Sequence, residues 1–333
     1  MTLLWIDGFD HYTTAQFVDK GYTINGASIT ANGRFGGGSA YTFISSYYFK
    51  KNFGVNKSTI YTGIAIKKIT AGNPAYSATY PLIFFYDESG VVQVRVHITA
   101  GFELSAYNGA GTLLGTSASS VVPDQTWFHL EVKVTVSDTV GVVEINVDGT
   151  QVLNLTSKDT KYGSDYIRSI QFGTIYSSKY TYWDDLYIDD AQFHGNCEVK
   201  TFMPDADGNS SDFTRSGGSN DYECVDENPS NEETDYISSG TANHKSIFGI
   251  TTGSLSTVKG IQVNTHCRIE EAGSREITPI VRSNGTDYSG TETDNIDATY
   301  GFKSEVFEDD PDDSNPWTQT KLEAAEFGLE ITT

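Results

Sequence analysis

Apolar and polar positions alternate with a period of two through the first two hundred residues. Between Phe128 and Val136 every second residue is apolar, and the same pattern recurs in 143–147 before Asp148-Gly149. This period predicts strands with one face on a core and one in water, and Asp-Gly between two such runs predicts a hairpin. Further runs that predict strands recur about every 8 to 12 residues, and no helical pattern is present before residue 200. The chain is therefore predicted to be all-β, a sandwich or jelly roll.

The composition changes after Gly195. Residues 204–235 are acidic and rich in Ser, Asn and Gly, which is typical of linkers and long loops. Strand patterns then return at 245–250, 258–269, 276–282 and 299–307, and a short helical turn is expected at 318–325. We predict a jelly-roll domain over residues 1–197, an acidic linker with loops over 198–235, and a smaller, mostly β-domain over 236–333.

The chain is strongly acidic, with 44 Asp and Glu against 22 Lys and Arg and a formal net charge of -22. A surface of this kind repels phosphates and anionic lipid headgroups, so we expect neither nucleic acid nor a membrane as a partner. The three cysteines are widely spaced, without the pairs of a zinc site, and are expected to be reduced thiols. The sequence begins without the pattern of a signal peptide, and no run approaches the ~20 apolar residues that span a bilayer.

Several segments resemble a known family. The strand Trp127-Phe-His-Leu-Glu-Val and the hairpin in 143–152 resemble the central strands of concanavalin-A-like (laminin-G-like) jelly rolls. The segment Tyr182-Trp-Asp-Asp-Leu-Tyr-Ile resembles the strand that closes such domains and lies beside the first strand, and Ile6-Asp-Gly-Phe-Asp resembles their start. This likeness covers residues 3–195 and implies a concanavalin-A-like jelly-roll sandwich.

The remainder is similar to the tails of bacteriophage virion proteins that carry this same module, through segments such as 201–208 and 279–288. The resemblance implies a structural component of a phage particle: a minor tail, fibre or head-decoration protein. Such a protein would be located in the virion, be assembled in the host cytoplasm, and contact other virion proteins and copies of itself. A homo-oligomer is therefore expected, with a trimer as the first hypothesis.

The same jelly-roll fold includes glycoside hydrolases, in which one strand carries a Glu-x-Asp-x-x-Glu motif. The nearest match runs from Glu144 to Asp148, but it lacks the third carboxylate, and Asp148 belongs to the hairpin turn. His129 is expected to be a surface residue on the polar face of its strand. We therefore predict no catalytic residue, and a protein that is not an enzyme.

Two acidic segments are candidate metal sites. Asp184 and Asp185 are adjacent, and adjacent strand residues point to opposite faces unless a bulge intervenes. The run 205–212 resembles a calcium loop, but its glycine is at the fourth position instead of the sixth. No metal site or cofactor is predicted. Calcium is the one ion considered, with Asp184, Asp205, Asp207 and Asn209 as weak candidate ligands.

The surplus of aromatic residues, 20 Tyr and 18 Phe, is the remaining functional signal. Tyr is enriched at interfaces and stacks on sugar rings, because it joins a large apolar area to a polar tip. Segments 41–49 and 176–183 are predicted to form one exposed aromatic patch that contacts another virion chain. The alternative is a glycan-binding adhesin module that attaches the particle to its host. The predicted binding residues are Tyr41, Tyr47, Tyr48, Tyr176, Tyr180, Tyr182 and Trp183.

Overall fold

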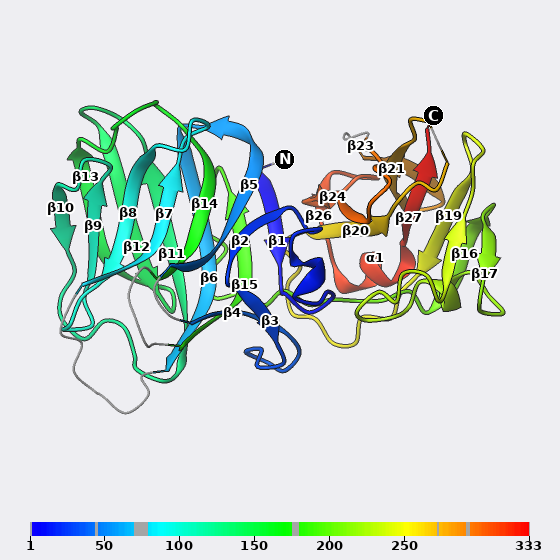
Figure 1. The fold of residues 1–333 in the computed structure, drawn as a ribbon, viewed down its shortest axis with the longest axis horizontal. Coiled ribbons are helices and arrows are strands. Elements are labelled where there is room, and N and C mark those ends of the chain that lie inside the picture. Colours follow the sequence, from blue (N-terminus) through cyan, green and yellow to red (C-terminus); the bar gives the residue numbers. More distant parts are fainter. Residues whose placement is uncertain are drawn as a thin grey trace. The chain divides into compact units, whose positions relative to one another are not determined.

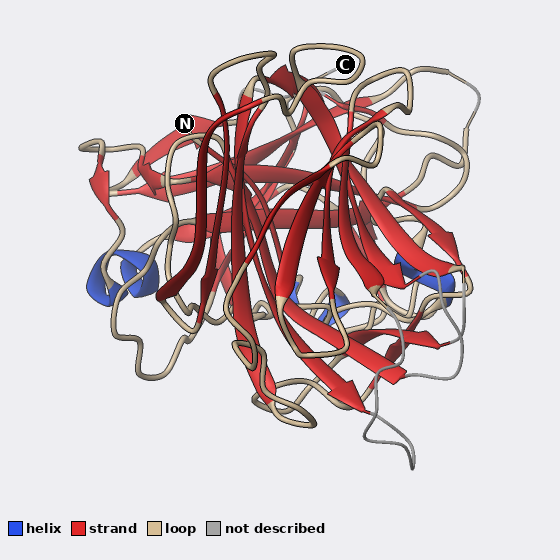
Figure 2. Cartoon of the chain, turned by 90° about the vertical axis from the view of Figure 1, so that its left-hand side faces the viewer, coloured by secondary structure: helices blue, strands red, loops and turns tan. Residues whose placement is uncertain are grey.

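The computed structural model describes residues 2–43, 46–69, 79–174, 180–271, 273–290 and 294–332. The chain divides into two compact units, Thr2–Val199 and Lys200–Thr333 (Figure 1). Regular structure is almost entirely strand, and the helices are short (Figure 2). Among the helices in these ranges, none is long and apolar enough to cross a membrane.

The first unit consists of two antiparallel sheets. Sheet A has the order β13-β12-β11-β6-β15-β4-β3, with β1 beside β15, and sheet B has the order β10-β9-β8-β7-β14-β5-β2 (Figure 1). Sheet A contains β1 (Leu3–Asp7), β3 (Ser28–Thr30), β4 (Ser39–Phe43), β6 (Thr59–Ile69), β11 (Trp127–Thr135), β12 (Gly141–Val147), β13 (Thr150–Lys158) and β15 (Tyr180–Asp189). Sheet B contains β2 (Tyr22–Asn25), β5 (Tyr47–Lys57), β7 (Tyr80–Tyr86), β8 (Val92–Ile98), β9 (Leu104–Asn108), β10 (Leu113–Thr116) and β14 (Ile167–Thr174). A one-turn helix, η1 (Ala15–Phe17), follows β1.

The inner faces of the two sheets form the core of the first unit. The apolar positions of β11 that alternate in the sequence are all buried there. Phe49 and Phe172 of sheet B contact Trp183 of sheet A. The centroid of the Trp183 ring lies 5.9 Å from that of Phe49 and 6.1 Å from that of Phe172. The prediction of an all-β jelly-roll sandwich is confirmed. Trp183 is wrong as a binding residue, because its side chain has no exposed surface and its indole N–H donates to Thr42 Oγ1 at 3.0 Å.

The second unit is built on one larger sheet and several short hairpins. The sheet has the order β16-β19-β27-β21-β22, with β23 on β21. Its strands are β16 (Ala206–Ser211), β19 (Lys245–Gly249), β21 (Glu276–Ser283), β22 (Thr286–Ser289), β23 (Asp294–Asn295) and β27 (Glu326–Ile331). The hairpin strands are β17 (Thr214–Ser216), β18 (Tyr236–Ser238), β20 (Ile261–Cys267), β24 (Gly301–Phe307), β25 (Asp309–Asp310) and β26 (Asn315–Pro316), and η2 (Tyr222–Cys224) is a one-turn helix.

Residues 198–235, which the sequence predicts to be an acidic linker with loops, contain paired strands in the structure. Strand β16 lies within this segment and pairs with β19, and β17 pairs with β18, so most of the segment is part of the second unit. Strand β16 has no buried residue. Because no residue of this strand is buried, its sequence does not need the alternation of apolar and polar residues by which a strand is predicted.

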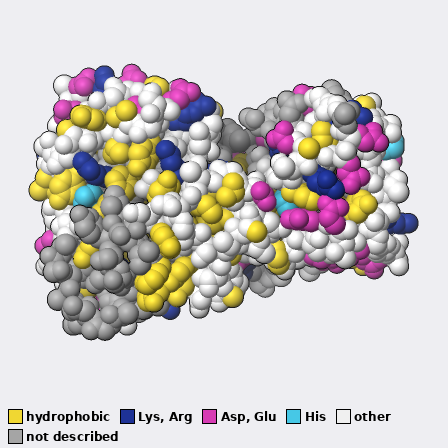
Figure 3. All heavy atoms as spheres, in the orientation of Figure 1, with side chains coloured by type: hydrophobic (Ala, Val, Ile, Leu, Met, Phe, Trp, Pro, Cys, Tyr) yellow, Lys and Arg dark blue, Asp and Glu magenta, His cyan; other side chains and the backbone are white. Residues whose placement is uncertain are grey.

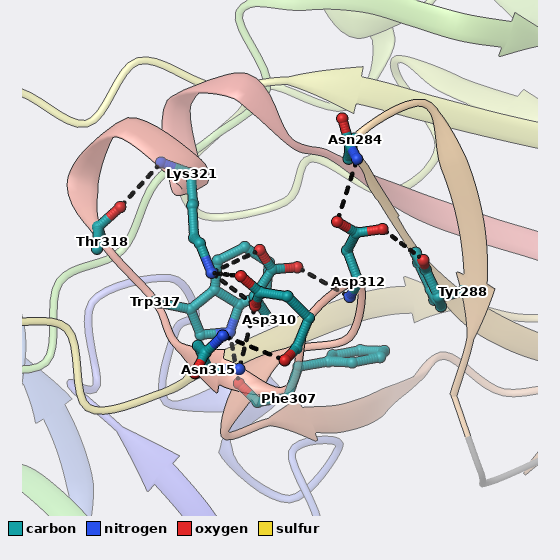
Figure 4. A network of polar contacts seen from close by, with 10 residues as sticks. Asn284, Tyr288, Phe307, Asp310, Asp312, Asn315, Trp317, Thr318 and Lys321 are labelled. Atoms are coloured by element: carbon teal, nitrogen blue, oxygen red, sulfur yellow. Dashed lines mark hydrogen bonds and ion pairs between the residues drawn. The ribbon is translucent and has the colours of Figure 1, made fainter.

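The short helix α1 (Gln319–Ala324), the expected helical turn, packs Leu322 into the core of the second unit. Its start is capped by Thr318, whose hydroxyl accepts from the Lys321 backbone N–H at 3.2 Å (Figure 4). The Lys321 ammonium group contacts Asp310 at 3.2 Å (Figure 4). It also contacts Asp313 at 2.7 Å. The buried Trp317 ring next to it donates to the Phe307 carbonyl at 3.1 Å. Lys321 thus offsets part of the negative charge of the acidic segment 309–316.

Candidate functional site

The outer face of sheet B carries a row of side chains that the strand order places next to one another. Alternate strand residues share a face, so these residues point away from the core that Phe49, Phe85 and Ile170 occupy. The row crosses the strands β9, β8, β7, β14, β5 and β2 in that order. Its members, each directly opposite the next, are Tyr107, Arg95, Phe84, Gln171, Lys50 and Thr23.

A hollow of about 370 Å³ lies over one part of this row. Its volume lies within the range of roughly 300–1,000 Å³ that small ligands occupy. Its lining combines two tyrosines with amide, hydroxyl and charged groups. The lining residues are Thr23, Tyr48, Lys50, Asn52, Tyr86, Asp87, Glu88, Arg168, Ser169 and Gln171. On the first unit, Figure 3 shows basic side chains among apolar ones, with most of the visible acidic side chains along the upper rim.

Lys50, Tyr86 and Gln171 are linked within the hollow. The Lys50 ammonium nitrogen lies 4.0 Å from the centroid of the Tyr86 ring, and the Tyr86 hydroxyl donates to Gln171 Oε1 at 3.2 Å. Burial lowers the pKa of the Lys50 ammonium, against the opposing effect of the charge of Asp87. The Gln171 amide nitrogen has no protein partner among the described residues, so it can donate to a ligand.

The two acidic residues at the rim are held by other groups. Asp87 is buried and accepts hydrogen bonds from Val91 N (2.9 Å), Gln93 Nε2 (3.1 Å) and Ser164 Oγ (2.8 Å). Glu88 forms an ion pair with Arg168 at 3.3 Å. Asp87 therefore fixes the turn between β7 and β8, and neither carboxylate neutralises Lys50 directly.

His97 and Tyr107 lie at the far end of the same face. Their ring centroids are 4.6 Å apart, and His97 Nε2 is buried without a hydrogen-bond partner among the residues described. Burial, and then the charge of Arg95, lower the pKa of His97 to about 4, so the ring is neutral at pH 7. Sequence reasoning missed this end of the face. The available signal was that the polar positions of 92–98 are Gln, Arg and His, with no acidic residue.

The predicted aromatic patch is divided between the two sheets. Tyr41, Tyr180 and Tyr182 lie with Phe43 on the outer face of sheet A, where Phe43 and Tyr180 stack with centroids 4.4 Å apart. Tyr48 lies in the hollow on sheet B instead. The Tyr47 ring covers Gly26, and Tyr176 falls outside the described residues.

The expectation that Asp184 and Asp185 point apart is wrong, because β15 contains a bulge there. The register shifts after Asp184, and Asp185 has a φ of 51°. Asp184 Oδ2 accepts from the Arg34 backbone N–H at 2.7 Å, and Asp185 Oδ2 accepts from the Arg34 guanidinium at 3.2 Å. Burial and the charge of Asp185 raise the pKa of Asp184 to about 8, and burial raises that of Asp10 to about 6.

The weak metal candidates of the sequence are not assembled into a site. Asp207 accepts from the Tyr222 backbone N–H at 2.8 Å, and the Asn209 backbone N–H donates to Glu326 at 2.9 Å. In the part of the chain that the structure describes, no group of three or more His, Cys, Asp or Glu side chains is arranged to hold a metal ion. The expectation of no metal or cofactor therefore stays a prediction.

His129 is fully buried, so its expected position on the surface is wrong. Its ring stacks near Tyr187, whose hydroxyl donates to Glu131 Oε1 at 2.5 Å. The Gly195 backbone N–H also donates to Glu131, at 2.7 Å. The chain after β15 therefore folds over this part of the outer face of sheet A and removes it from solvent.

No family model and no curated protein matches the chain. Solved structures that it is similar to include an endo-β-1,4-glucuronan lyase from the fungus Trichoderma reesei (12% identity, 57% of this chain and 96% of that chain, TM-score 0.41). A second is the catalytic domain of a glycoside hydrolase family 131 protein from Coprinopsis cinerea (12% identity, 60% of this chain and 98% of that chain, TM-score 0.43). A third is the carbohydrate-binding module CBM66 from Bacillus subtilis (12% identity, 51% of this chain and 96% of that chain, TM-score 0.35).

These comparisons correct one prediction. Lyases and a glycoside hydrolase are among the solved structures found, which contradicts the prediction that the chain is not an enzyme. The missing paired-carboxylate motif does not exclude catalysis. The jelly-roll assignment itself rests on the sheet topology, and nothing in the comparisons indicates a phage origin.

Proposed function

We propose that the first unit binds carbohydrate in the hollow on the outer face of sheet B. The observation that supports this most directly is the combination of the Tyr48 and Tyr86 rings with Lys50, Asn52 and Gln171 around one hollow. A sugar ring presents an apolar C–H face and a rim of hydroxyl groups. It therefore requires an aromatic surface together with hydrogen-bond donors and acceptors that converge on it.

The aromatic group on sheet A is the weaker location for this function. Its rings face one another, with Tyr41 and Tyr182 centroids 5.3 Å apart and Phe43 stacked on Tyr180. Much of their apolar area is therefore already in contact with other rings. Tyr41 is nevertheless partly exposed and serves as a matched control for Tyr86.

The test is a titration of the full chain with a panel of oligosaccharides, followed by calorimetry or by NMR shifts. Tyr86→Ala is expected to lower the affinity for the best ligand by roughly tenfold or more, since stacked aromatic side chains dominate such sites. Tyr41→Ala should leave the affinity unchanged. Thermal unfolding of both variants checks that they fold. Loss of binding in Tyr41→Ala alone, or no binding of any sugar at millimolar concentration, would contradict the proposal.

The finer role implied by the phage resemblance stays a prediction. It places the chain in the virion as a structural component that contacts copies of itself and other virion proteins. The described residues offer no observation that favours this role over glycan binding, the alternative read from the same sequence.

A further inference from the structure

Sheet B is free of acidic residues, although the chain contains 44 of them. None of its seven strands contains Asp or Glu. The strands of sheet A, by contrast, carry Asp7, Glu131, Glu144, Asp184, Asp185 and Asp189. The basic residues of sheet B are Lys50, Lys51, Lys57, Arg95 and Arg168. In this strongly acidic protein, all Asp, Glu, Lys and Arg side chains on the strands of sheet B are therefore basic ones.

Three of these basic groups are already engaged. Lys51 is buried, with its ammonium group 3.1 Å from the centroid of the Trp5 ring. Lys57 pairs with Asp190 at 2.5 Å, and Arg168 pairs with Glu88.

Lys50 and Arg95 remain, and neither has a carboxylate within ion-pair distance among the described residues. Arg95 donates one hydrogen bond, to the Gly109 carbonyl at 3.3 Å. Both belong to the row across the outer face, three strands apart, with Gln171 and Phe84 between them. Adjacent strands are ~4.8 Å apart, so the two cations are separated by roughly 14 Å.

We propose that the ligand of this face is an acidic polysaccharide whose chain crosses β5, β14, β7 and β8, with anionic groups on Lys50 and Arg95. This proposal rests on the proposed function and names its substrate class. A neutral sugar leaves the half-buried Lys50 charge without a counter-ion, whereas a carboxylate or sulfate supplies one. Basic groups on strands without acidic side chains also attract anions locally, despite the net charge of -22 and the carboxylates of Asp87 and Glu88 at the rim of the hollow.

Phosphate could satisfy the same two cations, but a nucleic acid is the less favourable polyanion. Duplex DNA carries one charge per ~1.7 Å of its axis, and it would require many more basic contacts than this face offers. The acidic surface elsewhere on the protein repels so dense a charge. A regularly spaced acidic sugar chain matches two widely separated cations better.

The experiment compares three oligomers of equal length by calorimetry: an oligouronate, a neutral gluco-oligosaccharide and a DNA duplex. The full chain is used, at low and at raised salt. We expect the oligouronate to bind roughly tenfold more tightly than the neutral oligomer at low salt, with an affinity that falls as salt screens the charges. Lys50→Met and Arg95→Met should each reduce that preference, and Lys158→Met on sheet A is the control.

The outcomes separate the two proposals. If the neutral oligomer binds as well as the oligouronate, or if Lys50→Met and Arg95→Met leave the preference intact, the acidic ligand is wrong and carbohydrate binding stands. If no oligosaccharide binds, both proposals fail. Tighter binding of DNA than of either sugar would overturn the acidic polysaccharide as the ligand.

Discussion

The ammonium nitrogen of Lys50 lies 4.0 Å from the centroid of the Tyr86 ring, although the two residues are on strands that are not neighbours in the sheet. Strand β14 lies between them and contributes Gln171, which accepts from the Tyr86 hydroxyl. The ring therefore holds the cation over the sheet and partly shields it from water. Burial lowers the pKa of Lys50, whereas the π face of the ring by itself favours the charged form.

The first prediction concerns the pH dependence of binding. Because burial lowers the pKa of Lys50, this residue loses its charge at a lower pH than an exposed lysine does. The affinity for an acidic oligosaccharide should therefore fall as the pH rises through that pKa. Lys50→Arg stays charged over this range and should remove the fall. Calorimetric titrations from about pH 7 to about pH 10 test this, and identical profiles for the two proteins would contradict it.

The second prediction concerns Asp184, whose pKa is raised to about 8 by burial and by Asp185. A carboxyl group with a raised folded-state pKa stabilises the fold while it is protonated, and this contribution is lost as the pH rises from its unfolded value near 4 to about 8. The wild type should lose stability over this window relative to Asp184→Asn, which cannot ionise. Urea unfolding measures the difference between the two proteins at each pH.

This comparison must be made as a difference, because other groups titrate nearby. The buried Lys20 has a pKa lowered to about 7 by desolvation, and its contribution to stability increases as the pH rises above that value. Both proteins share this effect, so it cancels. Parallel stability curves for wild type and Asp184→Asn would show that Asp184 does not titrate in the fold.

The third prediction concerns Gly63, which allows the buried Tyr187 ring to lie against β6. A Cβ at Gly63 would be 2.0 Å from Tyr187 Cε1 and 2.8 Å from His129 Cε1. The ring would have to move and would weaken its hydrogen bond to Glu131. Gly63→Ala should therefore destabilise the first unit by about 3 kcal/mol, as overpacked cores do. Gly101→Ala is the control, since its nearest atoms are 3.4 Å away, and equal losses in the two variants would contradict the explanation.

The fourth prediction concerns Lys321, which contacts Asp310 (Figure 4) and also Asp313. Asp310 is almost fully buried, so Lys321→Met leaves a buried carboxylate without its cation. The second unit should unfold at a lower denaturant concentration, and the difference from wild type should shrink at high salt. Trp317, the one tryptophan in 200–333, contributes to the fluorescence change on unfolding, together with the three tryptophans of the first unit. Lys303→Met on β24 is the control, and an equal shift there would contradict a specific role for Lys321.

The sequence alone was sufficient for the strands and for the layered architecture. Alternation in 128–136 and 143–147 is local, and it identifies the buried face of each strand because successive side chains point to opposite sides. The hairpin at Asp148-Gly149 is also local, with φ of 49° and 78° at the two residues. By contrast, the polar strand β16 carries no alternation, so its sequence predicts a linker.

The candidate site was decided by the tertiary structure. Strand β14 is inserted between β5 and β7, far from both in the chain, and only this order brings Gln171 between Lys50 and Phe84. Two further features were equally hidden: the bulge that turns Asp185 towards Arg34, and the segment after β15 that buries His129. A period of two fixes which residues share a strand face. Strand order, bulges and covering loops depend on contacts between distant segments, which that local pattern does not encode.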